Sequence, residues 1–334
     1  MKKLLLLTLS FVLMLTGCSP AQNNSESKLD LEELTDNVYV DYDRTKNENV
    51  SAQPIYYAQH IKPDDSALAS LFVKPPKIYD NERRNRVFEN ESEYGRYGSH
   101  GIVSYRTNDG MNIFIASQIC LDDDMSSVKE LDFMSLEELY KKFDEDVHKF
   151  IDNYEIYEMT AFTADKFEEI TTLTGPSNLE EGWCEPRDVY YIRARQFVND
   201  IPIFTGISPT SVDTMFHDGA RIEACYTENG LEYFDIIGGY QVGEEKTADG
   251  EFIDLKGAEQ IIRDYYEMPY GPEYEILYDC ALVYVGVFEG DKTILTPAWE
   301  FYCDYGLEPR SPWQDIGSPA IRINAYTGEF MRWS

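Results

Sequence analysis

The sequence predicts an α+β fold in which antiparallel sheets carry helices packed on one face. Turn signals between apolar runs, such as Asn108-Asp109-Gly110 and Asn229-Gly230, predict hairpins. A capping box at Ser135 opens a segment whose apolar residues recur every three or four positions, which indicates an amphipathic helix. Because helix followed by antiparallel strands returns after Asp254, we expect the arrangement to repeat along the chain.

The first 17 residues have the character of a signal peptide. Lys2 and Lys3 precede an apolar run that ends at Leu15, and this run is too short to span a bilayer. The following Leu15-Thr16-Gly17-Cys18 resembles the lipobox of bacterial lipoproteins. The resemblance implies cleavage before Cys18, attachment of diacylglycerol to Cys18 and a chain anchored by lipid on the extracytoplasmic face of the cell membrane. The alternative is a retained hydrophobic helix with an incidental cysteine.

Charge excludes one class of ligand. The formal net charge is −32, and removal of Lys2 and Lys3 with residues 1–17 leaves −34. Such a chain repels phosphate backbones, so we expect no nucleic acid partner. Residues 18–35 are polar without apolar periodicity and are expected to form a flexible tether.

Five cysteines remain if Cys18 carries lipid. They have no metal-ligand spacing, and outside the cytoplasm their odd number leaves at least one free thiol. A two-residue turn at Asp291-Lys292 would place Cys280 opposite Cys303, whereas a turn at Gly290-Asp291 would place them diagonally. Glycine at the first central position favours the second register, so a disulfide is expected only with the first register or a longer loop. The five are Cys120, Cys184, Cys225, Cys280 and Cys303.

Residues 36–130 are expected to form an N-terminal α+β domain. Strands are predicted over 38–42 and 54–58, and Asp64-Asp65 should open a short helix. Residues 101–106 and 111–116 should pair as a hairpin. Residues 74–100, rich in arginine, glycine and proline, are interpreted as an irregular excursion or a binding loop.

Residues 131–250 are expected to form a middle α+β module. The helix behind Ser135 should run to Tyr154, and a shorter helix should end at Leu173. Strands are then expected over the ranges 188–198, 201–205, 220–227 and 231–242.

Residues 251–334 are expected to form a C-terminal module. Asp254 should cap a helix, and strands are predicted over 275–288, 295–302 and 320–324. The segment 281–288 is apolar on both faces, so we expect a central strand there. The face that carries Trp299 and Phe301 should be core rather than a ligand platform.

Two segments carry a resemblance to a known family. The turn at 197–203, Phe-Val-Asn-Asp-Ile-Pro-Ile, and the ending Pro297-Ala298-Trp299 with Asn324-Ala325 and Thr327-Gly328-Glu329 resemble PepSY-like modules. They are also similar to the extracytoplasmic YycH/YycI accessory proteins that regulate a membrane histidine kinase, and to Gram-positive lipoproteins of unknown function. The resemblance covers about residues 160–334 and implies PepSY-like modules in tandem. Asp200 stands where the family has glycine.

No catalytic, cofactor-binding or metal site is expected. The four histidines are widely separated and no HExxH, GxSxG or phosphate-loop pattern occurs; Gly98-Ser99-His100-Gly101 lacks the strand-then-helix context of a nucleophile. The run Asp122-Asp123-Asp124 lacks the spacing of a calcium loop. We therefore expect a non-enzymatic lipoprotein that binds or modulates an envelope protein or peptide. The alternatives are a solute-binding lipoprotein of a transporter and a carboxylate-dependent envelope hydrolase.

Overall fold

The chain is mostly β. The computed structural model describes residues 32–35, 38–47, 49–83, 85–121, 130–173, 183–204, 220–266, 275–289, 292–304 and 320–331. Strands account for 46% and helices for 23% of this part, and the strands form one large mixed sheet. The expected α+β fold, with antiparallel sheets covered by helices on one face and PepSY-like modules in tandem, is therefore wrong. Cys18, the signal peptide and nearly all of the tether lie outside the described residues.

The described residues form helices and strands as follows. The helices are η1 (Arg44–Lys46), α2 (Asp65–Ala69), η2 (Ser99–Gly101), α3 (Gly110–Leu121), α4 (Leu136–Val147), α5 (Ala164–Leu173) and α6 (Leu255–Tyr266). The strands are β1 (Glu32–Thr35), β2 (Val38–Val40), β3 (Ile55–His60), β4 (Lys77–Asp80), β5 (Arg86–Glu89), β6 (Glu93–Tyr97), β7 (Val103–Thr107), β8 (Tyr154–Phe162), β9 (Val189–Val198), β10 (Ile201–Phe204), β11 (Arg221–Thr227), β12 (Gly230–Ile237), β13 (Tyr240–Lys246), β14 (Glu275–Glu289), β15 (Lys292–Asp304) and β16 (Ala320–Asn324).

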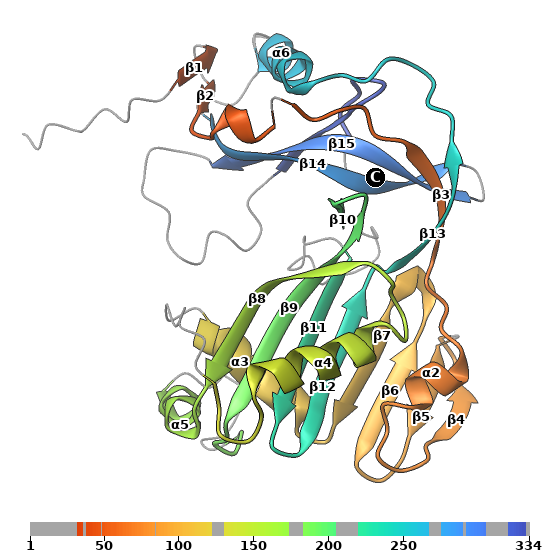
Figure 1. Ribbon diagram of the computed structural model, residues 1–334, viewed down its shortest axis with the longest axis vertical. Coiled ribbons are helices and arrows are strands. Elements are labelled where there is room, and N and C mark those ends of the chain that lie inside the picture. The colour runs from red at the N-terminus through yellow and green to blue at the C-terminus, as the bar shows by residue number, and fades with distance from the viewer. Residues whose placement is uncertain are drawn as a thin grey trace, which may run out of the picture.

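The sheet has two parts, which Figure 1 shows one above the other. The lower sheet contains β4 to β9, β11 and β12, and all of its pairs are antiparallel. The upper sheet contains β1 to β3, β10 and β13 to β16. Its strand β14 pairs parallel with β10 and β2, which the expectation of antiparallel sheets excluded. Strand β10 also pairs with β9 and so joins the two sheets.

Helices cover both faces of the lower sheet, because its central strands are apolar on both. On β9, Tyr190, Ile192 and Ala194 belong to the core that α4 closes. Val189 and Tyr191 point the opposite way, into a core shared with α3 and α5. Alternate residues of a strand face opposite sides, so each apolar face needs its own cover. Figure 1 shows α4 in front of the sheet and α3 behind it.

The upper sheet confirms two expectations. Strand β14 is central, with β15 on one side and β10 and β2 on the other. Trp299 and Phe301 are fully buried in the core beneath α6, and Trp299 Nε1 donates a hydrogen bond to the carbonyl of Ile253 (2.7 Å). This face is therefore core, as predicted.

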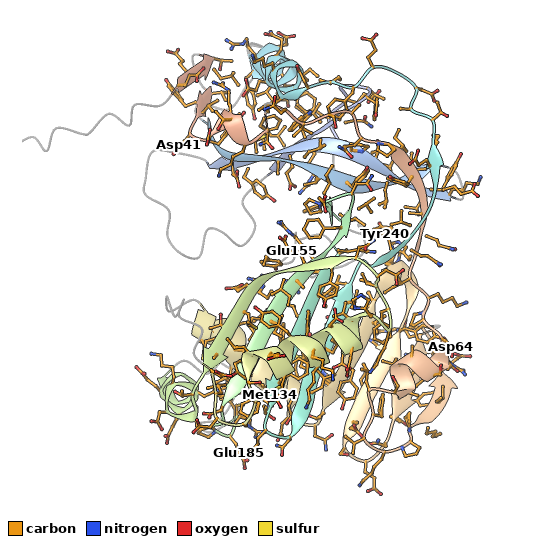
Figure 2. All side chains as sticks on the ribbon, in the orientation of Figure 1. Asp41, Asp64, Met134, Glu155, Glu185 and Tyr240 are labelled. Atoms are coloured by element: carbon orange, nitrogen blue, oxygen red, sulfur yellow. The ribbon has the colours of Figure 1, made fainter. Side chains whose placement is uncertain are left out.

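A cluster of apolar residues fills the junction between the two sheets. It includes Tyr56 and Tyr284, whose ring centroids lie 5.8 Å apart, and Tyr240, which Figure 2 labels at this level of the molecule. The β9–β10 turn points into the junction, because Asn199 Nδ2 donates to the hydroxyl of Tyr56 (2.7 Å). Burial of these side chains joins the sheets into one body.

Three local expectations are corrected. Residues 110–121 form helix α3 and not a hairpin strand, because their nearly continuous apolar run is buried between β strands and α5. Residues 74–100 are a meander of β4, β5 and β6 and not an irregular excursion. Helix α4 ends at Val147, and Tyr154 begins strand β8.

In the long hairpin of β14 and β15, Glu289 pairs with Lys292, which is the register that the sequence favours. Cys280 lies opposite Phe301, and the register that would have placed it opposite Cys303 is not used. Cys184, Cys225 and Cys280 are buried free thiols, and Cys120 is buried. The domain boundaries near residues 130 and 250 stay predictions.

Candidate functional site

A polar pocket of about 810 Å³ lies beside the junction of the two sheets. Its walls come from the end of β3, the first turn of α2 and the ends of the β4–β6 meander. The sequence places these ends together because the chain leaves the upper sheet at His60 and enters the lower one through α2. The lining residues used below are His60, Asp65, Asp80, Arg86, Tyr97 and His100.

An arginine between two carboxylates forms one wall. Arg86 Nη2 donates to Asp65 Oδ2 (2.6 Å), and Arg86 Nη1 lies 3.3 Å from Asp80 Oδ1. The hydroxyl of Tyr97 donates to Asp65 Oδ1 (3.0 Å). The hydrogen bond from Arg86 is the main cause that holds the pKa of Asp65 below its ordinary value, and the two carboxylates raise the pKa of Arg86. This wall stays charged at neutral pH.

Two histidines form the opposite wall. The rings of His60 and His100 meet edge to face with centroids 5.6 Å apart, and His60 stacks on Tyr240 at 4.6 Å. Burial lowers the pKa of His60, and the charge of His100 lowers it further, against a backbone hydrogen bond with Gly239. His60 Nδ1 is buried without a hydrogen bond in the described part of the chain. The pair therefore favours the neutral imidazole of His60.

The backbone at His100 is bent into an uncommon conformation. Its φ is +66°, in the left-handed region that non-glycine residues rarely adopt, and Gly101 follows with the same φ. A Cβ on Gly101 would lie 2.1 Å from the carbonyl oxygen of Gly239, so only glycine fits there. The close crossing of these two segments holds His100 against His60.

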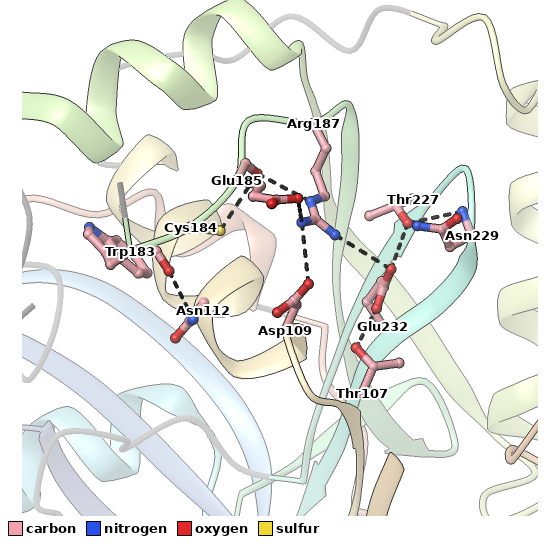
Figure 3. Close-up of polar contacts among 10 residues, drawn as sticks. All are labelled: Thr107, Asp109, Asn112, Trp183, Cys184, Glu185, Arg187, Thr227, Asn229 and Glu232. Carbon is pink, nitrogen blue, oxygen red and sulfur yellow. Dashed lines mark hydrogen bonds and ion pairs between the residues drawn. The ribbon is translucent and has the colours of Figure 1, made fainter. Parts of the chain in front are cut away.

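A second polar cluster surrounds Arg187 at the far end of the lower sheet (Figure 3). The Arg187 guanidinium lies 3.4 Å from Asp109 and 3.9 Å from Glu232, and it also contacts Glu185. Glu232 accepts hydrogen bonds from Thr107 and Thr227. The cluster ties the start of α3 to β12 and to the segment before β9. Since each of its three carboxylates already contacts a protein donor, we assign it a structural role.

A partly buried carboxyl lies on the rear face of the lower sheet. Asp235 Oδ1 accepts from Ser104 Oγ (2.6 Å), and Glu223 lies directly opposite Asp235 on β11. Burial, with the nearby charge of Glu223, raises the pKa of Asp235 to about 6. Glu223 itself pairs with Arg221 (2.9 Å) and accepts from the hydroxyl of Tyr191 (2.5 Å). Together these residues form a row of polar side chains that crosses β7, β12 and β11 on one face of the lower sheet.

Some of the residues singled out in the sequence lie outside the described part of the chain, and others lie at the surface or in a turn. Cys18, His217 and the Asp122-Asp123-Asp124 run lie outside the described residues. His148 caps α4 on the surface, 3.1 Å from Asp144. The segment around His100 is a short 3₁₀ turn that leads into β7, so it has no nucleophile-elbow geometry. Among the described residues no group of three or more His, Cys, Asp or Glu could hold a metal ion.

Sequence reasoning missed the pocket. His60 and His100 are separated by a whole helix and a meander, and no periodicity links two side chains so far apart. The available signal was the segment 74–100, which was interpreted as an irregular excursion or a binding loop and which supplies four of the lining residues used here. Its Gly98-Ser99-His100-Gly101 phrase was also considered for a nucleophile, which is a different chemistry.

Comparison with known proteins gives the fold alone. No protein-family model and no curated protein matches the chain. The crystal structure of an uncharacterized protein from Eubacterium rectale is similar with a TM-score of 0.54 at 14% identity, covering 90% of this chain and 92% of that chain. YycH from Bacillus subtilis matches with a TM-score of 0.36 at 12% identity, covering 76% of this chain and 49% of that chain.

The first of these likenesses shows that a protein of similar length shares this fold, and it carries no statement about activity. The likeness to YycH is too distant to carry an argument. In the parts of the chain that the structure describes, no helix combines the length and the apolar character needed to cross a membrane.

Proposed function

We propose that this protein is a lipid-anchored extracytoplasmic lipoprotein that acts by binding an envelope protein or peptide and not by catalysis. The observation that carries the location is the sequence Leu15-Thr16-Gly17-Cys18 behind a short apolar run. Lipid on Cys18 would hold the chain at the membrane, and the part of the expected tether that precedes β1 would separate the folded part from it.

The pocket chemistry supports binding over catalysis. A general acid or base works best when its pKa lies near the operating pH. Here the pKa of Asp65 is lowered by Arg86, and the pKa of His60 is lowered by burial. The two pocket carboxylates, Asp65 and Asp80, are both engaged by Arg86 and are not a free acid–base pair of the kind that a glycoside hydrolase uses. These groups are suited to recognising a polar partner.

The size of the pocket favours one second candidate. A pocket of about 810 Å³ beside the junction of the sheets is in the range that holds a small molecule. The protein would then be a solute-binding lipoprotein of a transporter. A thermal-shift screen with sugars, amino acids and metal ions tests this, and a strong shift that His100→Ala abolishes would favour it over the protein partner.

The location and the partner can be tested in one set of cells. Metabolic labelling with an alkyne fatty acid should tag the wild type and leave Cys18→Ala unlabelled. Crosslinking on intact cells followed by mass spectrometry should then recover a defined envelope protein with the wild type. Equal labelling of both variants would remove the lipid anchor from the proposal, and the absence of any reproducible crosslink would remove the partner.

A further inference from the structure

A short turn links one wall of the pocket to the crossing between the two sheets. We define the His100 turn as residues 98–101, which connect β6 to β7 in the lower sheet. The amide of Gly239 donates a hydrogen bond to the carbonyl of Gly101 (3.1 Å), and the amide of Ile61 donates to the carbonyl of Gly239 (3.0 Å). Gly239 precedes β13 and Ile61 follows β3, so the turn is attached to the upper sheet at this point.

His60 is the fixed side of the contact with the turn. Its ring stacks on Tyr240 with centroids 4.6 Å apart, and the two residues pair in the ladder of β3 and β13. The backbone of Tyr240 is held in turn by the buried Gln196 of β9. The amide of Tyr240 donates to Gln196 Oε1 (2.9 Å), and its carbonyl accepts from Nε2 (2.6 Å). Moving His60 would break both the stack and the ladder.

His100 is the side that can move. It is exposed, and its φ of +66° is strained for a residue with a side chain. Such strain persists only where neighbouring contacts hold the backbone in place. Across the joint, the turn is held by the edge-to-face contact of His100 with His60, at 5.6 Å, and by the hydrogen bond from Gly239 to Gly101. Loss of these contacts would let the turn relax away from His60.

Protonation of His60 weakens the closed arrangement. His60 Nδ1 is buried and makes no hydrogen bond within the described part of the chain. A protonated imidazole carries a hydrogen on both ring nitrogens, so protonation would leave a buried donor without an acceptor, which costs free energy. If His100 is protonated as well, two positive rings repel each other across the joint.

The other groups around the pocket do not compensate for this cost. Besides the two histidines, the charged or titratable lining residues are Lys62, Asp65, Asp80, Arg86 and Tyr97. The two carboxylates are already paired with the arginine, and the lysine adds a further positive charge. Behind the ring, burial raises the pKa of Tyr240 to about 12, so this residue stays neutral. The backbone of Gly239 favours the protonated ring of His60, but burial and the charge of His100 outweigh it and lower the pKa of His60.

We propose that the His100 turn is a movable wall of the pocket, held closed by neutral His60 and released when His60 is protonated. Release breaks the hydrogen bond from Gly239 to Gly101, widens the pocket and exposes the ring of His60. This inference goes beyond the proposed function, because it depends neither on the lipid anchor nor on what occupies the pocket.

Hydrogen exchange of single backbone amides, measured by NMR on the full-length protein at pH 7.5 and 5.5, tests the release. In the released form His60 regains its ordinary pKa of 6.5, so at pH 5.5 protonation should favour release about tenfold. The protection factor of the Gly239 amide should therefore fall about tenfold from pH 7.5 to 5.5. The Ile61 amide should keep its protection, because its acceptor stays with the upper sheet.

Three variants separate the histidine from other effects of acid. His60→Phe keeps the stack on Tyr240 but cannot be protonated, so its Gly239 amide should be equally protected at both pH values. His148→Gln removes a histidine whose side chain is 46% exposed, and it should reproduce the wild-type fall. Gly101→Ala places a Cβ 2.1 Å from the carbonyl oxygen of Gly239 and should release the turn at both pH values.

A second measurement follows the pocket itself. A soluble gadolinium chelate should relax the His60 ring signals of the wild type more strongly at pH 5.5 than at pH 7.5, because release exposes the ring. Equal relaxation at both pH values would contradict the proposal, and this outcome needs no variant.

Three exchange results would also overturn the proposal. They are an unchanged Gly239 amide in the wild type, an equal fall in His60→Phe, and an equal fall at Ile61 and at the core residue Ile192. The last would mean that acid loosens the whole molecule and not the turn. All of these experiments use purified protein, so a failure of lipid labelling or crosslinking would remove the proposed function and leave the movable wall in place.

Discussion

At the scale of single residues, charged side chains in the described part of this acidic chain have specific partners. Arg86 is partly exposed and held between Asp65 and Asp80, and the buried Arg322 contacts Glu300 through Nε at 2.5 Å while its guanidinium stacks over Phe204. Glu300 is fully buried, so losing its arginine would leave an uncompensated charge. His60 and Asp235 differ. Burial lowers the pKa of His60 and raises the pKa of Asp235, so in both cases it favours the neutral form.

His60 should make the protein less stable in acid. Its pKa is lowered in the folded state, so the unfolded chain binds more protons, and the stabilisation is complete above the ordinary pKa of 6.5 and is lost as the pH falls below it. We expect wild type to lose free energy of unfolding relative to His60→Phe between pH 7.5 and 5, since phenylalanine keeps the stack on Tyr240. Urea unfolding measures this, and the surface variant His148→Gln should follow the wild type. A constant difference at all pH values would contradict the prediction.

Asp235 should act in the opposite direction. Its pKa is raised from 3.8 to about 6, so the folded state binds more protons between these values, and stability falls as the pH rises through that window. Asp235→Asn, which can still accept from Ser104, should gain stability relative to wild type on going from pH 4 to pH 7. The exposed Asp132→Asn serves as the control. If the wild type gained more stability than the variant over that range, the folded protein would be stabilising the ionised carboxylate, which would contradict the prediction.

At the scale of elements, the helices owe their positions to the strands beneath them. In α4, Leu139, Phe143 and Val147 are fully buried against the lower sheet, and the capping box of Ser135 and Glu138 starts the helix. Periodicity therefore located α4. Helix α3 is nearly apolar all round and buried, so no face pattern could distinguish it from a strand.

Truncation on the two sides of α4 should have very different effects. Phe143→Ala removes a fully buried ring and should lower the free energy of unfolding by about 3–5 kcal/mol. Tyr140→Ala on the same helix removes a side chain that is 45% exposed and should change stability by less than about 0.5 kcal/mol. Chemical unfolding of both variants measures the contrast, and similar losses would mean that α4 is not docked as described.

A glycine in the β9–β10 turn should make the folded protein more stable. Asn199 and Asp200 have φ of +49° and +61°, as a two-residue type I′ turn requires, and Asp at the second position carries a cost that glycine does not. We expect Asp200→Gly to raise the free energy of unfolding by about 1 kcal/mol. A loss of stability in thermal or urea unfolding would show that the Asp200 side chain contributes more than its backbone strain.

At the scale of the whole molecule, a large negative charge is spread over two sheets that share one junction. Repulsion among these charges destabilises the compact state, and salt screens it. We expect the Tm to rise as NaCl increases from 10 to 500 mM, as followed by circular dichroism. A Tm that fell over this range would mean that local ion pairs, such as Arg86 with its two aspartates, outweigh the general repulsion.

The sequence by itself determined the features that depend on neighbouring residues. The capped helices after Ser135 and Asp254, the turns at Asn199-Asp200 and Asn229-Gly230, the central strand at 281–288 and the buried Trp299 were predicted from local patterns and are present. The lipid on Cys18 is likewise a sequence-level prediction, and it awaits labelling.

Only the tertiary structure decided how these elements combine. Parallel pairing of β14 with β10 and β2 joins segments far apart in the chain, and the contact of His60 with His100 depends on the path between the two sheets. Such long-range pairings gain their free energy from burial across the junction, and local periodicity contains no record of which strands meet there. The edge position of β4 was decided in the same way, because a strand is an edge only in relation to the rest of the sheet.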